Sequence, residues 1–166
     1  RLRDGMRAID LLEVLEDHGR VLVEAGYIHF ELLRQLKASL HPEHLQVVRL
    51  GSAMQKAFTG RKLILAPGDK LTLAYTNNAH FKGKAADTWA ARSLAYNKLL
   101  AKDEVQPTQD RPFPHTLDEA ICCRLVEALD IAACSDAMLL LHGLAPYEAK
   151  EALARHIDFS LEDLNI

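Results

Sequence analysis

A dense run of basic side chains in the middle of the chain is the strongest chemical signal in the sequence. Residues 49–84 carry seven lysines and arginines against one acid, Asp69, which gives a local charge of +6. The basic residues are Arg49, Lys56, Arg61, Lys62, Lys70, Lys82 and Lys84, and three aromatic residues lie among them, Phe58, Tyr75 and Phe81. Lysine and arginine bind phosphates and carboxylates, and aromatic rings stack on bases. This basic segment is therefore a candidate surface for anions or for an acidic partner.

The charge of the C-terminal third has the opposite sign. Residues 103–163 hold 13 acids against four bases, a charge of −9, although the whole chain sums to only −3. One interpretation is that the basic and acidic thirds pack near each other and the cations stay solvated. A second is an acidic protein partner, and a third is binding of phosphate, nucleic acid or anionic lipid through 49–84. A sequence pI near 6.2 disfavours nucleic acid as a partner.

Arg34 and His41 form a second candidate site. Six residues separate them, at or just beyond the end of an expected helix. This Arg-x6-His spacing resembles the motif of HEPN-type ribonucleases, which are all-helical. The resemblance implies an RNA-cleaving enzyme that uses Arg34 and His41 in catalysis. The alternative is a solvated Arg34 and a His41 that interacts favourably with a helix C-terminus.

Histidines and cysteines do not assemble a recognisable metal motif. His41-Pro-Glu-His44 differs from the His-Glu-x-x-His motif of zinc proteases, and the proline spreads the two histidines apart. Cys122, Cys123 and Cys134 include no Cys-x-x-Cys pair. An odd number of thiols on one expected helical stretch is typical of reduced core cysteines. We therefore expect an intracellular, cytoplasmic protein with no metal and no cofactor.

Common enzyme signatures are missing as well. Residues 65–70 lack the glycine spacing of a phosphate-binding loop, and Ser52 lacks the flanking glycines of a nucleophile elbow. The carboxylates of Asp118 and Glu119 are expected on an exposed helix face, whereas a catalytic carboxylate pair needs burial to shift its pKa. The sequence therefore favours binding over catalysis.

The elements that position these residues are expected to be helices. The chain contains 28 leucines and 23 alanines but only 20 valines, isoleucines and threonines together, which favours helix over strand. Trp89 is expected on the core-facing side of its helix. Apolar residues recur at helical spacing in 8–25, 28–40, 42–58, 84–102 and from 116 onward. We expect a mainly α fold, an antiparallel bundle of six to eight helices.

Residues 59–83 are the expected exception to helix. Two short apolar runs flank a Pro-Gly-Asp sequence at 67–69, and apolar residues alternate with polar or small ones over 71–75. This pattern predicts a β-hairpin or a long irregular excursion.

Composition also predicts a domain organisation. Residues 103–115 contain three prolines and few large apolar side chains, which is typical of a linker. It would join an N-terminal helical bundle, 1–102, to an acidic C-terminal helical unit, 116–166, the two packed as one domain. The capping-box pattern that opens at Thr116 predicts where the second unit begins. No apolar run approaches the roughly 20 residues of a membrane span, and no secretory signal is visible at the N-terminus.

Some expected helices carry more apolar residues than a single buried face needs. Residues 21–23 and 139–141 are consecutive apolar triplets, so some helices would be covered on two sides. We therefore expect a noncatalytic interaction or scaffold module that binds a partner helix or peptide between amphipathic helices. The partner would be another protein, acidic or helical, or a second copy of the chain in a homo-oligomer.

Overall fold

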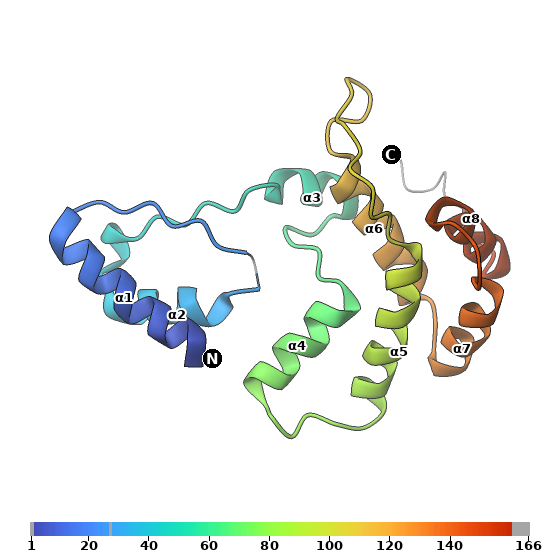
Figure 1. The fold of residues 1–166 in the computed structure, drawn as a ribbon, viewed down its shortest axis with the longest axis horizontal. Coiled ribbons are helices and arrows are strands. Elements are labelled where there is room, and N and C mark those ends of the chain that lie inside the picture. Colours follow the sequence, from blue (N-terminus) through green and yellow to red (C-terminus); the bar gives the residue numbers. More distant parts are fainter. Residues whose placement is uncertain (1, 27, 161–166) are drawn as a thin grey trace. The chain divides into compact units, whose positions relative to one another are not determined.

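The computed structural model describes residues 2–26 and 28–160, and in these ranges the chain forms helices and no strand (Figure 1). The expectation of a mainly α fold is confirmed. The chain divides into two compact units, Arg1–Arg49 and Leu50–Ile166. None of the described helices is both long enough and apolar enough to cross a bilayer.

The first unit is a helical pair with a short 3₁₀ turn. Its elements are α1 (Leu2–His18), α2 (Phe30–Ser39) and η1 (Pro42–His44). Ala8, Leu32 and Leu36 are buried between the two helices, and partly buried leucines surround them. The His29 ring Nδ1 lies 2.9 Å from Asp4 Oδ1, which joins the start of α2 to α1.

The helix expected over 42–58 is broken in the structure. Pro42 opens only η1, and α3 (Ser52–Thr59) begins after Gly51, whose φ of 75° is left-handed. Glycine adopts that conformation without steric cost, and it interrupts a right-handed helix. The first helix ends earlier than the apolar pattern over 8–25 predicts, because α1 ends at His18, before Gly19.

The β-hairpin predicted within 59–83 is wrong. Residues 67–77 form α4 (Pro67–Asn77), and only the stretches on either side of α4 are irregular. Pro67 takes the first helical position, where its missing N–H leaves no bond unmade. The Asp69 carboxylate accepts a hydrogen bond from the Ala66 N–H at 3.2 Å. The Pro-Gly-Asp sequence is therefore the N-terminus of a helix rather than a turn between strands.

The second unit holds most of the core. Its later helices are α5 (Lys84–Leu99), α6 (Pro114–Glu127), α7 (Ile131–Leu140) and α8 (Pro146–His156). Helix α5 packs against α4, α6, α7 and α8, and Figure 1 shows it between α4 and α7. The largest fully buried side chains include Leu99, Leu125, Leu129, Leu141 and Leu153. These leucines fix the positions of α5 to α8.

The proline-rich connection between α5 and α6 has no regular structure, and α6 begins at Pro114, two residues before the predicted start at Thr116. Helices α5 and α6, on either side of this connection, pack together. The boundary between the compact units lies at Arg49 and Leu50. The division into 1–102 and 116–166 stays a prediction.

Candidate functional site

Two cations of the basic segment pair with one glutamate of the acidic third. Lys70 Nζ, on α4, lies 2.9 Å from Glu127 Oε1 at the end of α6, and Arg61 Nη1 lies 3.4 Å from the same oxygen. Burial raises the pKa of Glu127, but hydrogen bonds and charges from Lys70 and Arg61 outweigh it, so the net pKa lies below its usual value. The basic and acidic thirds therefore meet here, inside the second unit.

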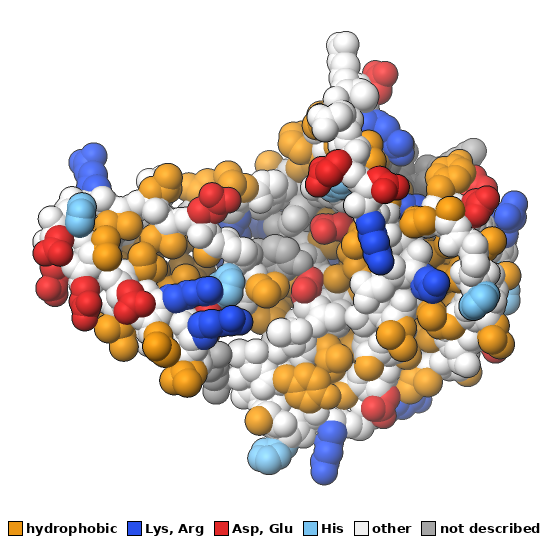
Figure 2. All heavy atoms as spheres, viewed as in Figure 1, with side chains coloured by type: hydrophobic (Ala, Val, Ile, Leu, Met, Phe, Trp, Pro, Cys, Tyr) orange, Lys and Arg blue, Asp and Glu red, His pale blue; other side chains and the backbone are white. Residues whose placement is uncertain are grey.

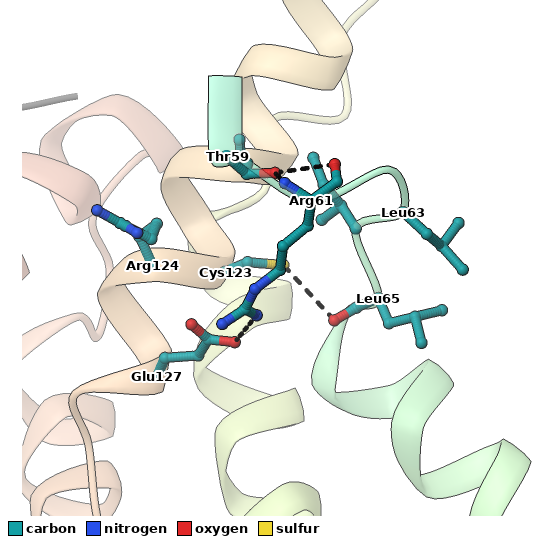
Figure 3. Close-up of a pocket in the computed structure, with 9 residues that line it drawn as sticks. Thr59, Arg61, Leu63, Leu65, Cys123, Arg124 and Glu127 are labelled. Carbon is teal, nitrogen blue, oxygen red and sulfur yellow. Dashed lines mark hydrogen bonds and ion pairs between the residues drawn. The ribbon is translucent and has the colours of Figure 1, made fainter. Parts of the chain in front are cut away.

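A small cavity lies beside this ion pair (Figure 3). Its volume is about 30 Å³, and residues from α3, from the segment that precedes α4 and from α6 line it. Figure 3 shows Arg61 reaching to Glu127 across the cavity, while the side chain of Arg124 extends away from Cys123. Sites for drug-sized ligands measure about 300–1,000 Å³. This cavity therefore has room for water rather than for a substrate of that size.

The thiol of Cys123 faces the cavity but is not activated. Its Sγ lies 4.0 Å from the Leu65 carbonyl oxygen. Burial raises the pKa of Cys123 to about 12, although the nearby charge of Lys70 lowers it in part. Burial also raises the pKa values of Cys122 and Cys134, and all three thiols are free and buried. Because the thiolate is the nucleophile, these thiols are structural at neutral pH.

Two carboxylates of α6 are less exposed than expected. Asp118 accepts a hydrogen bond from the Ala101 N–H at 2.9 Å and a second one from Lys150 Nζ on α8. The side chains of Asp118 and Lys150 are only 18% and 11% exposed. Burial raises the pKa of Glu119, and the charges of Asp69 and Asp118 raise it further. The expectation of an exposed Asp118 and Glu119 is therefore wrong, and Asp118 ties α8 and the segment just after α5 to α6.

Two of the predicted aromatic residues come together with Trp89. The ring centroids of Tyr75 and Phe81 lie 6.1 Å apart in an edge-to-face arrangement, and Phe81 stacks on Trp89 at 5.4 Å. Trp89 is partly exposed and belongs to this aromatic cluster, so its predicted place in the core is wrong. Phe58 lies on α3, outside the cluster.

The remaining cations of the basic segment are exposed. They are Arg49, Lys56, Lys62, Lys82 and Lys84. None of them forms an ion pair with another residue in 2–26 or 28–160. Of the predicted binding residues, the structure therefore brings together two pairs. Arg61 and Lys70 meet at Glu127, and Tyr75 contacts Phe81.

Arg34 and His41 are engaged separately in the first unit. Arg34 Nε donates a hydrogen bond to Glu31 Oε2 at 2.9 Å, and this bond and the charge of Glu31 raise the pKa of Arg34. His41 Nδ1 lies 3.4 Å from Glu43 Oε1. Among the described residues of this unit, no hydrogen bond or ion pair joins Arg34 to His41. The ribonuclease hypothesis stays a prediction.

Metal ligands are not gathered in the described part of the chain. Over residues 2–26 and 28–160, no three side chains of His, Cys, Asp or Glu are placed to hold an ion together.

The sequence pattern did not reveal the acidic partners of the site. Glu127 lies 57 residues from Lys70 along the chain, so no local spacing connects them. The separation of basic and acidic thirds was the only signal that such a contact exists. The apolar spacing of α5 predicts a core position for Trp89, but spacing along one helix does not show that Phe81, from the preceding connection, stacks on it.

Comparisons with known proteins find one similar sequence. No protein-family model and no solved structure matches the chain. A protein of Archaeoglobus fulgidus, described as uncharacterised, is 31% identical over 133 residues. The match covers 80% of this chain and 44% of the relative, so the chain spans less than half the length of the protein it matches.

Proposed function

We propose that this chain is a noncatalytic interaction module that pairs one helix of its first unit with a helix of a second copy. The observation that carries the proposal is an apolar stripe on α1. Leu2, Met6 and Ile9 are 82%, 58% and 59% exposed. Spacings of four and three residues place these side chains on one face of the helix.

This stripe is separate from the face that α1 turns toward its own unit. Ala8 is 3% exposed and packs against α2. Because a helix turns about 100° per residue, the face around Ala8 lies well away from the stripe. Burial of a Leu, Ile or Met side chain stabilises by about 1.5–3 kcal/mol. A second helix laid on the stripe would gain this contribution without disturbing the contact with α2.

The small core of the first unit also supports a partner. Only Ala8, Leu32 and Leu36 are buried among its described residues. Helical units of this size rarely gain enough stability from one small core, and association with a partner is a common remedy. The first unit has a face suited to that purpose on α1.

Charges beside the stripe favour a second copy in antiparallel orientation. Arg3 and Asp10 are seven residues apart, so they lie on the same flank of α1. Neither forms an ion pair with another residue in the described ranges. When two α1 helices pair antiparallel about Met6, Arg3 of each copy lies near Asp10 of the other. Such a two-fold contact buries the same surface on both copies.

Sedimentation equilibrium tests this pairing. The stripe is smaller than a standard protein interface, so we expect weak association, seen as a rise from 18.5 kDa toward twice that mass between about 10 μM and about 1 mM. Arg3→Glu should weaken association because two acids then face each other, and Arg3→Glu/Asp10→Arg should restore it. A double variant as weak as Arg3→Glu would contradict the antiparallel arrangement.

A further inference from the structure

A partly exposed aromatic cluster joins the end of α4, the connection to α5 and the first half of α5. Phe81 and Trp89 stack with an angle of 27° between their ring planes, and Tyr75 meets Phe81 edge-to-face at 81°. Tyr75 is 47% exposed. Nearly half of a large aromatic side chain is therefore accessible near the end of α4, in contact with a second ring.

Unneutralised cations lie next to this cluster. Lys82 and Lys84 are exposed, and His80 precedes them in the same connection. No acid occurs between Asp69 and Asp87. Lys70 and Arg61, by contrast, both pair with Glu127. Figure 2 shows hydrophobic, basic and histidine side chains together over the turn between α4 and α5.

The chemistry of this surface fits a ligand that has both flat aromatic groups and phosphates. We propose that the α4–α5 connection binds single-stranded nucleic acid, with a base stacked on Tyr75 and phosphates near Lys82 and Lys84. Stacking on exposed aromatic side chains and contacts from lysines to phosphates are how proteins hold single strands without reading their sequence. An overall pI near 6.2 limits nonspecific affinity, but it does not remove the local positive charge.

The same connection is poorly suited to a membrane surface. Insertion into the headgroup region requires apolar side chains at the outermost positions. Here the exposed positions between the helices are Asn78, Ala79, His80, Lys82 and Gly83, and the Phe81 ring is turned toward Trp89. We therefore assign the surface to a single strand and treat anionic lipid as an outcome that would overturn the proposal. The α1 stripe of the first unit takes no part in it.

Trp89 makes the test direct, because it is the chain's single tryptophan. We expect its fluorescence to change and saturate when an oligothymidylate of about 12 nucleotides is added. Two phosphate contacts on a single strand give a salt slope of about −1.4. Affinity should therefore fall about sevenfold between about 50 and 200 mM salt.

Variants locate the binding. Lys82→Glu/Lys84→Glu should weaken oligothymidylate binding at least about tenfold. Lys56→Glu/Lys62→Glu makes the same charge change at two other exposed lysines of the basic segment and should stay within about twofold of the unmodified chain. Thermal unfolding followed by circular dichroism confirms that each variant is folded. Tyr75→Leu keeps an apolar side chain but removes the stacking face, and should weaken binding about tenfold.

Three results would overturn the proposal. One is a Trp89 signal that does not saturate with the oligonucleotide at about 50 mM salt. Another is an equal loss of binding in the two lysine variants, which would indicate a diffuse charge effect. The third is a Trp89 response to vesicles of phosphatidylserine and phosphatidylcholine with none to the oligonucleotide, which would assign the surface to a membrane.

Discussion

Lys70 and Glu127 are 57 residues apart in the sequence, yet Lys70 Nζ donates a hydrogen bond to Glu127 Oε1 at 2.9 Å. The bond joins the first half of α4 to the last turn of α6. It also shows that part of the positive charge of the basic segment is satisfied within the second unit. The cations that remain for a partner are therefore those away from Glu127.

Glu127→Gln should reduce stability by about 1 kcal/mol at pH 7, between the values for exposed ion pairs and for hydrogen bonds to buried charges. The folded-state pKa of Glu127 is lowered. Its stabilising contribution is therefore present above the unfolded-state pKa and is lost as the pH falls through the folded-state pKa. Urea unfolding should show the difference between the two proteins shrinking in acid. Asp136→Asn, at an exposed position on α7, is the control, and a difference that does not depend on pH would contradict this account.

Glu119→Gln should have the opposite effect. Burial and two neighbouring carboxylates raise the folded-state pKa of Glu119, so its ionised form destabilises the fold above that pKa. The neutral amide of glutamine removes this effect. We expect the free energy of unfolding to rise by no more than about 1 kcal/mol at pH 7, because solvent still reaches the group. The gain should vanish in acid, where both side chains are neutral. A loss of stability at pH 7 in urea unfolding would be inconsistent with this description.

Lys150→Met should be strongly destabilising because it leaves the Asp118 carboxylate without its cation in a mostly buried position. Loss of one partner of a buried pair costs about 3–5 kcal/mol, and we expect about 2–4 kcal/mol here because some solvent reaches Asp118. Asp118→Asn/Lys150→Met should lose less stability than Lys150→Met alone, since no uncompensated charge remains. Urea unfolding midpoints measure both, and a double variant less stable than Lys150→Met would refute this role for the pair.

The three thiols should resist modification in the folded chain. All of them are buried, and burial raises their pKa values. Reaction with an aromatic disulfide reagent at about pH 8 should therefore follow unfolding and reach three equivalents only in denaturant. Rapid reaction of one thiol under native conditions would show that a cysteine is activated.

The sequence was informative where local chemistry decides the structure. The helix predicted to open at Thr116 begins two residues earlier, at Pro114, and the excess of leucine and alanine predicts helix throughout. Local chemistry was ambiguous at Pro67 and Asp69, which suit either a turn or a helix N-terminus. In the structure this segment is helical, and the resulting helix α4 packs on α5.

The candidate sites were less predictable because they depend on contacts between distant residues. No spacing rule links Lys70 to Glu127 or Asp118 to Lys150. The stripe on α1 begins before the apolar pattern over 8–25 that predicts this helix, and which face of α1 packs on α2 is decided by the tertiary structure. Exposure of Leu2, Met6 and Ile9 therefore had to come from the fold.

The most direct test of the proposed pairing compares two substitutions on α1 by sedimentation equilibrium. Met6→Glu/Ile9→Glu places charges in the stripe, whereas Val14→Glu introduces a charge at another exposed apolar position, about 140° around the helix from Ile9. The account predicts that the unmodified chain and Val14→Glu associate as the concentration rises, while the double variant stays at the mass of one chain. A mass of 18.5 kDa for the unmodified chain up to about 1 mM, or undiminished association of the double variant, would contradict it.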